Sequence, residues 1–290
     1  MAKETGIPVD IWRFYLLYVR PEGQDSSFSW SDLMLKNNSE LLNNLGNFVN
    51  RAGMFVSKFF ESTVPEMDLN LEDKWLLAQI SWELQQYNRL LEKVRIRDAL
   101  RCVLNISRYG NQYIQINEPW KRIKGSDTER KRAGTVTGVA VNVACLLSVM
   151  LLPYMPTVSA AIQRQLQAPE QCNSLTDRFV CVLRAGHRIG TVSPLFEKLE
   201  PGRIEELRNK YRGQKVSAEA RPDPGERESP VLPQDLRELV TKQGNRVRDL
   251  KARKAEKALI DAEVSALLDL KRRLQQAERK VGGGGEVTWP

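Results

Sequence analysis

The sequence predicts an all-α fold, in which a helical bundle is followed by a linker and a helical hairpin. Apolar side chains recur at helical spacing over several stretches of roughly twenty to thirty residues, and prolines separate these stretches. The 290 residues, of which 41% are apolar and 28% charged, are enough for one large or two modest domains with a core of ordinary size. We therefore expect helices packed against one another around an apolar core.

The first two helices are expected at residues 9–19 and 31–60. A Pro-Glu-Gly turn ends the first helix, and Ser29 provides a capping hydroxyl just before the second. Apolar side chains form an approximate stripe along the second segment, and Pro65 marks its end.

Three further helices are expected over residues 72–94, 97–116 and 130–150, with Pro119 beyond the end of the second. Long helices delimited by prolines are typical of an α-helical bundle. Between residues 177 and 196 the β-prone run Phe-Val-Cys-Val-Leu, with two glycines beyond it, favours a short β-hairpin.

Residues 133–163 contain no charged side chain and follow three consecutive bases, so their length alone would allow a membrane span. Polar residues such as Asn142 interrupt the apolar run, however, and Pro153 and Pro156 break the helix before it would finish crossing. A helix at the centre of a bundle is apolar nearly all round because it is packed nearly all round. We expect this second arrangement.

The composition changes at residues 213–233, where proline, charged and small side chains leave almost no apolar periodicity, as is typical of a linker. Residues 234–281 regain two apolar stripes and predict a helical hairpin, which is marginal in size for a core of its own. Residues 282–290 are expected to be a disordered tail.

The net charge and the small number of histidines and cysteines reduce the range of functions that this sequence could perform. The chain has 44 Lys and Arg against 36 Asp and Glu, a formal charge of +8, which favours a polyanionic partner and leaves RNA, DNA and acidic membrane open. The four cysteines form no CxxC pair and His187 is the single histidine, which argues against a zinc site of common spacing. Scattered thiols suit a reducing cytosol. Because no GxSxG motif is present, we expect His187 to be a structural turn residue rather than a catalytic one.

Two segments carry a family resemblance. LLNNLGNFVNRAGMFVSKFF at residues 41–60 and NISRYGNQYIQINEPWKRIK at residues 105–124 resemble the anticodon-binding domain of the methionyl-tRNA synthetase family, in its vertebrate cytoplasmic form. The resemblance covers about residues 6–199, and residues 97–101, RDALR, match the DALR-type signature of such domains. It implies a helical bundle of class I synthetase type over residues 31–212, a cytosolic location, and recognition of the CAU anticodon of tRNA(Met).

Three residues match the positions that read the anticodon in this family. Asn47 and Arg51 have the family's spacing of four residues on one helix, and Trp120 matches the tryptophan of its Pro-Trp motif. An aromatic ring can stack an unpaired base, and the amide and guanidinium groups, which share a helix face, can hydrogen bond to a base edge. Asparagine and arginine also occur at this spacing by chance, and a buried tryptophan usually belongs to a core. Three neighbouring asparagines leave open which of them contacts the base.

Basic side chains around Trp120 are candidates for contact with the tRNA backbone, which would add affinity and salt dependence without sequence choice. These are Lys121, Arg122, Lys124, Arg130, Lys131 and Arg132. Within the hairpin at residues 234–281, the segment LVTKQGNRVRDLKARKAEKALIDAEVSALLDLKRRL at residues 239–274 resembles the WHEP domain of several animal aminoacyl-tRNA synthetases, an auxiliary module that binds tRNA or protein. Its candidates for phosphate contact are Lys242, Arg246, Lys251, Arg253 and Lys254. A solvated charged face explains each of these equally well.

The HIGH and KMSKS signatures of the family's catalytic domain do not occur in the sequence. The resemblance implies that ATP and methionine bind that missing domain, that residues 1–30 are the segment following it, and that Met1 is an internal methionine of a longer protein. We expect this chain to bind tRNA(Met), with no cofactor, DNA or membrane partner, and to be inactive alone as a methionine--tRNA ligase. The alternative is a catalytically inert interaction module that docks on other aminoacyl-tRNA synthetases and scaffold proteins of a multi-synthetase complex.

Overall fold

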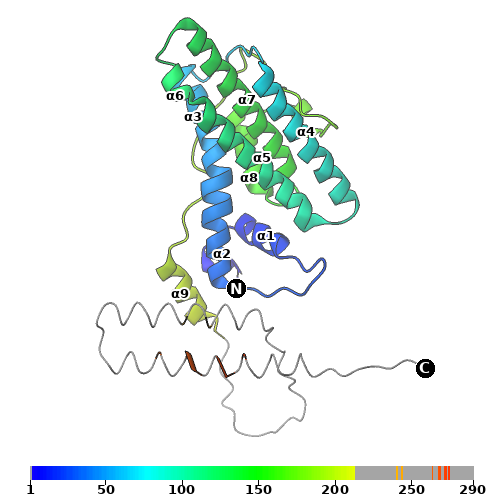
Figure 1. The fold of residues 1–290 in the computed structure, drawn as a ribbon, viewed down its shortest axis with the longest axis vertical. Helices are drawn as coiled ribbons and strands as arrows, with labels where there is room; N and C mark the ends of the chain where they lie inside the picture. The colour runs from blue at the N-terminus through cyan, green and yellow to red at the C-terminus, as the bar shows by residue number, and fades with distance from the viewer. Residues whose placement is uncertain are drawn as a thin grey trace, which may run out of the picture. The chain divides into compact units, whose positions relative to one another are not determined.

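The computed structural model describes residues 2–212 and, beyond them, positions 240, 243, 263, 267, 268, 271, 272 and 274. The chain divides into two compact units, residues 1–214 and 215–290. The described part of the first unit is an all-α bundle (Figure 1). In the second unit the described residues are all helical, and the Gln243 side chain donates a hydrogen bond to the backbone carbonyl of Glu263. The expected linker and tail lie outside the described residues.

A long rod of three helical segments begins the bundle, after η1 (Ala2–Thr5) and the short helix α1 (Val9–Tyr18). The rod consists of α2 (Trp30–Lys36), the π-helical stretch η2 (Asn37–Gly46) and α3 (Asn47–Phe59). Both junctions keep right-handed helical backbone angles, so the segments run on in one line (Figure 1). The Ser29 hydroxyl accepts a hydrogen bond from the backbone N–H of Asp32 and caps the rod, as predicted.

The three further helices predicted from the sequence are confirmed, and α4 and α5 pack against each other along their lengths (Figure 1). Capping boxes begin two of the helices, formed by Asn70 with Asp73 and by Ser126 with Glu129. The remaining elements in chain order are α4 (Leu71–Glu92), α5 (Ile96–Asn117), the single turn α6 (Pro119–Arg122), α7 (Asp127–Leu151), α8 (Pro156–Leu166), η3 (Glu170–Asn173) and α9 (Pro201–Lys210).

Helix α7 is apolar nearly all round because it packs against α3, α5, α6 and α8. Among the described residues it is the one helix long and apolar enough to cross a membrane, and 94% of its most apolar window is buried inside the bundle. Its composition therefore reflects burial in a protein core, as expected.

Residues 177–196 do not form the predicted β-hairpin. The described residues contain a single isolated bridge in this region, between Thr63 and Arg188, and no paired strands. Helix side chains satisfy the backbone instead: Asn142 accepts a hydrogen bond from the N–H of Leu183 at 2.7 Å and donates one to its carbonyl at 3.0 Å. The hydroxyl of Ser81 likewise accepts from the N–H of Phe179. A β-prone segment does not need a partner strand when other groups saturate its backbone.

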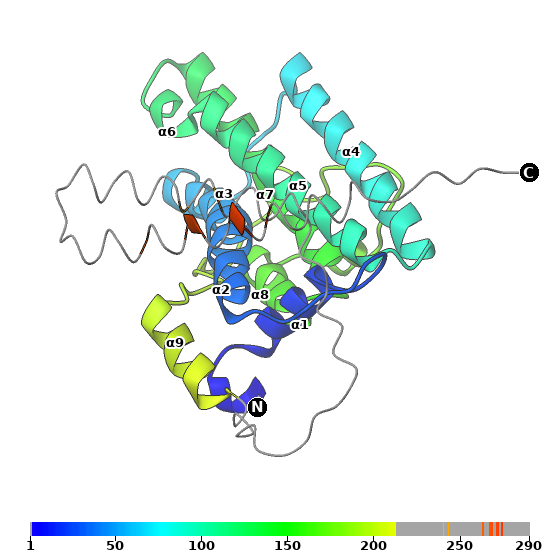
Figure 2. The same cartoon turned by 60° about the horizontal axis from the view of Figure 1, so that its bottom comes forward.

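The last helix of the first unit returns to the beginning of the chain. The Arg203 guanidinium on α9 donates a hydrogen bond to the carbonyl of Thr5 at 2.9 Å, and the Tyr211 hydroxyl donates to the Glu4 carboxylate at 3.1 Å. Tyr211 also stacks on Trp30 at the start of α2, with ring centroids 6.1 Å apart. Figure 2 shows α9 beside the N-terminal residues, so the two ends of this unit lie together.

Candidate nucleic-acid interface

Asn47 and Arg51 lie on the side of α3 that faces α5. The Asn47 amide donates a hydrogen bond to Oδ1 of Asn111 at 3.0 Å, and one turn further on Arg51 donates to Oε1 of Gln115 at 3.4 Å. Residues four apart share a helix face, so the two pairs are successive rungs of a polar ladder between the helices.

The ladder continues along η2. Arg108 donates two hydrogen bonds to the Glu40 carboxylate, at 2.8 and 2.7 Å, and Asn111 donates to the backbone carbonyl of Asn44 at 2.9 Å. The Asn44 amide donates to the carbonyl of Leu104 and is buried, whereas Asn47 is exposed. The geometry thus separates these two neighbouring asparagines, and only Asn47 of the pair presents its amide to solvent beside Arg51.

Trp120 lies on α6, half-buried and packed against the core. The guanidinium carbon of Arg51 lies 5.3 Å from the centroid of its ring, and the ring of Phe55 stacks on it at 6.1 Å with an interplanar angle of 28°. Burial at this contact lowers the pKa of Arg51. The structure therefore brings Arg51 and Trp120 together as a cation–π pair and leaves Asn47 one helical turn away.

A shallow groove of about 410 Å³ lies beside these residues, between the rod and α5. Its lining consists of amide and guanidinium side chains: Asn43, Asn44, Asn47, Arg51, Arg108, Asn111, Gln112 and Gln115. None of the described residues that line it is a carboxylate or a large apolar side chain. Such a surface offers both donors and acceptors, which is what the polar edge of a nucleobase requires.

Four of the lining residues were not identified from the sequence: Arg108, Asn111, Gln112 and Gln115 all come from α5. Their spacing of three and four residues places them on one helix face, within the polar stretch 105–124 that already carried the resemblance. That periodicity is the signal that could have found them.

The basic side chains around Trp120 differ from one another in exposure and in their partners. Lys124, Arg130 and Lys131 are exposed, and their charged groups have no partner among the described residues. Lys121 is exposed and pairs with Glu118 at 2.8 Å. The Nε of Arg122 donates to the carbonyl of Asn117 at 2.7 Å and so caps the end of α5.

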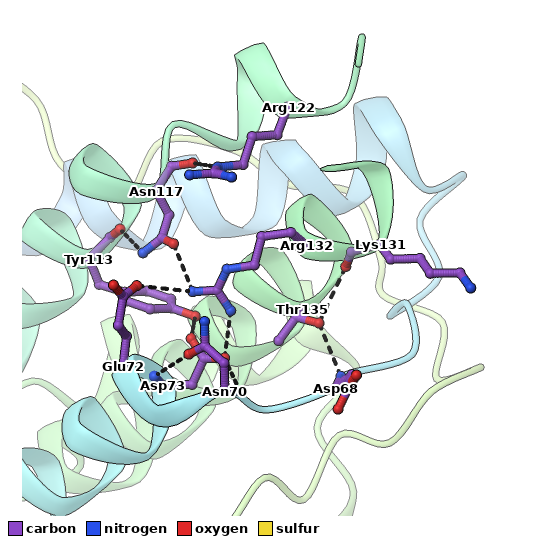
Figure 3. A network of polar contacts seen from close by, with 10 residues as sticks. All are labelled: Asp68, Asn70, Glu72, Asp73, Tyr113, Asn117, Arg122, Lys131, Arg132 and Thr135. Atoms are coloured by element: carbon purple, nitrogen blue, oxygen red, sulfur yellow. Dashed lines mark hydrogen bonds and ion pairs between the residues drawn. The ribbon is translucent and has the colours of Figure 1, made fainter. Parts of the chain in front are cut away.

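Arg132, expected among the backbone contacts, is instead engaged inside the bundle (Figure 3). Its guanidinium pairs with Asp73 at 2.5 Å and donates to Oδ1 of Asn117 at 2.7 Å, and its side chain is 15% exposed. Glu72 lies 3.8 Å from the same guanidinium. Its donors are committed to neighbours within the protein, so we exclude Arg132 from the candidate interface.

The electrostatics of this cluster follow from its burial. Asp73 is fully buried, which by itself would raise the pKa of its carboxyl. Hydrogen bonds from Arg132 and from the Tyr113 hydroxyl, the latter at 2.6 Å, outweigh that effect and lower the pKa of Asp73. Burial raises the pKa of Tyr113, and the adjacent carboxylate raises it further. The pair is therefore an ionised Asp–Arg bridge at neutral pH.

The other candidates from the sequence have simple outcomes. His187 closes a turn, where its backbone N–H donates to the carbonyl of Arg184 and its ring Nε2 donates to the carbonyl of Leu166 at 2.8 Å, so both groups contact the protein backbone. All four cysteines are free thiols. No group of three His, Cys, Asp or Glu that could hold a metal occurs in the described part of the chain. The five basic residues predicted to contact phosphate from residues 234–281 lie outside the described residues: Lys242, Arg246, Lys251, Arg253 and Lys254.

Family models match most of the chain. A model described as the anticodon binding domain of methionyl tRNA ligase matches residues 64–216, and the WHEP-TRS domain matches residues 236–281. A third, described as tRNA synthetases class I (M), matches residues 1–53. Trp120 therefore falls in the anticodon-binding match, and Asn47 and Arg51 fall in the class I match.

Similar proteins carry one name. The cytoplasmic methionine--tRNA ligase of Xenopus laevis is 66% identical over 289 residues, which are 97% of this chain and 32% of that protein. The one from Homo sapiens is 65% identical, with the same shares, and the one from Caenorhabditis elegans is 48% identical over 78% of this chain and 24% of its own length. The chain thus spans about a third of the length of its vertebrate relatives. Their cytoplasmic names support the cytosolic location expected from the thiols.

A solved structure agrees with the fold. Free methionyl-tRNA synthetase from Mycobacterium tuberculosis superposes with a TM-score of 0.65 at 25% identity, over 69% of this chain and 41% of that one. The chain therefore belongs to the methionyl-tRNA ligase family, of which it carries the anticodon-binding domain followed by a WHEP-TRS domain.

Proposed function

We propose that the groove between the rod and α5, together with Trp120, binds the anticodon of tRNA(Met) and distinguishes CAU from other anticodons. One observation carries the proposal: Arg51 stacks on Trp120 at the edge of a groove lined by amides, with exposed Asn47 one turn away. Within a protein like its relatives, which are named methionine--tRNA ligases, this chain would recognise the tRNA that receives methionine.

The chemistry of the groove suits single-stranded RNA. Anticodon bases can leave their stack, lie against an aromatic ring and hydrogen bond along their Watson–Crick edges. Amides supply a donor and an acceptor together, and a guanidinium supplies several donors in fixed geometry. Bulk positive charge could hold RNA but could not tell one base from another.

Arg51 is available for this exchange because its partners in the free protein are weak. It contacts a neutral amide at 3.4 Å and a ring face, and no carboxylate in the described part of the chain lies among its partners. A base edge can therefore replace Gln115 as the acceptor without separating an ion pair. Recognition by stacking and hydrogen bonds requires no cofactor.

Exposed lysine and arginine side chains near α6 would hold the phosphates of the anticodon stem. Lys124, Arg130 and Lys131 are unpaired in the described part of the chain, and Lys121 is exposed beside Glu118. Contacts of this kind add affinity that falls with salt and is the same for every anticodon. We propose the WHEP hairpin as a second contact of the same kind, which would raise overall affinity only if both units reach one tRNA.

The test is binding of the full chain, at fixed salt, to a CAU-anticodon initiator tRNA and to the same tRNA with an altered anticodon. We expect Trp120→Ala to reduce the preference for CAU by about tenfold, within the roughly 1–3 kcal/mol that stacking of one base contributes. Trp82→Ala is the matched control, because Trp82 is a tryptophan on α4 that is 62% exposed and lines none of the grooves around α3 and α5.

Two results would refute the proposal: equal binding of both tRNAs by the unmodified chain, or an unchanged preference in Trp120→Ala. Binding would then be electrostatic and centred elsewhere. Retained capture of other synthetases by such a chain would support the interaction module in its place.

A further inference from the structure

Asn117, the last residue of α5, is held by three hydrogen bonds. Its Oδ1 accepts from Arg132 at 2.7 Å, its amide donates to the carbonyl of Tyr113 at 3.1 Å, and its own carbonyl accepts from Nε of Arg122 at 2.7 Å. The residue is 4% exposed. An asparagine whose side chain and backbone are both engaged in this way has one position available to it.

Arg132 connects this residue to two other helices. One arm of its guanidinium, Nη1, pairs with Asp73 at the start of α4, and the other, Nη2, donates to Asn117 at the end of α5. Arg132 itself belongs to α7, so a single side chain joins three helices (Figure 3). The Tyr113 hydroxyl donates to the second oxygen of Asp73 and completes the bonding of that carboxylate.

The turn that carries Trp120 lies between two residues held by this cluster. Asn117 precedes it, and Arg122, the last residue of α6, reaches back to Asn117 with its side chain. Between them Glu118 adopts a left-handed backbone with φ of 42°, and Pro119 begins α6 with φ restricted by its ring. Little freedom remains in the backbone from which the Trp120 ring projects.

We infer that Arg132, Asn117 and Arg122 are positioning residues for Trp120, which they hold against Arg51 and beside the groove. The inference rests on the proposed function of Trp120 as a base-stacking ring. The network does not contact the bound base; it sets where the ring stands before RNA arrives. Preorganised recognition groups depend on supporting residues of this kind, because a loosely held ring loses its selectivity.

The guanidinium of Arg132 has two arms, so its effect on the position of Trp120 can be separated from its effect on stability. Lysine at position 132 would keep the charge opposite Asp73 but could not also reach Asn117 in the planar fork geometry of arginine. Arg132→Lys should therefore preserve the ion pair while releasing the end of α5.

Arg13→Lys is the matched control. Arg13 also joins two elements through two hydrogen bonds, from Nε to the carbonyl of Tyr154 at 3.1 Å and from Nη2 to that of Pro153 at 2.8 Å. Both residues follow α7 at its other end, away from α6. Losing these bonds affects stability without touching the support of Trp120.

The experiment uses the full chain labelled with 5-fluorotryptophan. Fluorine NMR of the free protein reports the Trp120 ring, whose signal is assigned by its loss in Trp120→Phe, and tRNA binding reports the preference for CAU. We expect Arg132→Lys to shift or broaden the Trp120 signal and to lower the CAU preference by about tenfold. Arg13→Lys should change neither, whatever its effect on the melting temperature.

Arg122→Lys provides a second variant if Arg132→Lys fails to fold, because it keeps the surface charge and removes only the Nε donor to Asn117. An unmoved Trp120 signal in the folded variants, with the CAU preference intact, would overturn the inference. If the unmodified chain shows no CAU preference, the proposed function fails, while the NMR signal of the free protein still decides whether the network positions the ring.

Discussion

Two clusters on either side of α5 are built from the same kinds of residue and have opposite properties. On one side Asn47 and Arg51 line an open groove, and Trp120 lies against Arg51 at its edge. On the other side Asn117, Arg132 and Tyr113 form a buried network. The difference lies in their partners. Arg132 pairs with a fully buried carboxylate, whereas the partners of Arg51 among the described residues are a neutral amide and a ring.

The composition of an Asn–Arg–aromatic group therefore does not decide whether the group is a binding site or a structural cluster. A guanidinium whose donors are saturated by a buried charge costs too much to move, because separation would leave an uncompensated ion in the interior. A guanidinium with exchangeable partners can give its donors to a ligand.

The largest effect is expected at Asp73. Asp73→Ala would remove the buried counter-ion of Arg132, whose side chain is 15% exposed, and leave it only the solvent-exposed Glu72 at 3.8 Å, which should lower the free energy of unfolding by about 3–5 kcal/mol. Urea unfolding of the full chain followed by circular dichroism measures the change. Glu66→Ala, at an exposed carboxylate, is the control and should stay within about 0.5 kcal/mol of the unmodified chain. A loss under about 1 kcal/mol at Asp73 would show that the network is not a strong structural element.

A smaller effect of the opposite kind is expected at Arg51. Arg51→Gln should weaken binding of a CAU tRNA by about tenfold, because a guanidinium donor aimed at a base edge is lost, and should leave unfolding nearly unchanged. Fluorescence anisotropy with labelled tRNA measures the first quantity. Lys58→Gln removes an equal charge from the same helix, at an exposed position beside Phe59, and should reduce binding of every anticodon alike. An Arg51 variant as unstable as Asp73→Ala would contradict the distinction between the clusters.

The smallest effect concerns pH. Hydrogen bonding lowers the pKa of Asp73 in the folded chain below its ordinary value of 3.8, so this carboxylate stabilises the fold above that value. Its contribution is lost as the pH falls through 3.8 toward the lower pKa of the folded state. Asp73→Asn should therefore be less stable at neutral pH but lose less stability between pH 5 and pH 3, as measured by thermal unfolding across that range. Asp68→Asn, at an exposed carboxylate, should follow the unmodified chain, and an equal slope in Asp73→Asn would mean that the pair is not ionised.

The helices were predictable because their signals are local. Apolar spacing, the cap at Ser29 and prolines such as Pro65 and Pro119 predicted the right elements, and the burial of α7 followed from its polar interruptions and Pro153. The hairpin at residues 177–196 was wrong because side chains of Asn142 and Ser81, distant in sequence, saturate its backbone. Local propensity contains no information about such partners.

The sequence alone determined the helical class, because periodicity and caps are properties of neighbouring residues. Its motifs also indicated the family and named Asn47, Arg51 and Trp120 as candidates for reading the anticodon. Only the tertiary structure decided which basic side chains remain exposed. Arg130, Lys131 and Arg132 are consecutive and look alike in the sequence, yet α7 turns Arg132 inward onto Asp73 and Asn117 and leaves the other two exposed. Adjacent side chains on a helix point about 100° apart around its axis. Whether one of them meets a carboxylate depends on a helix almost sixty residues away in the chain.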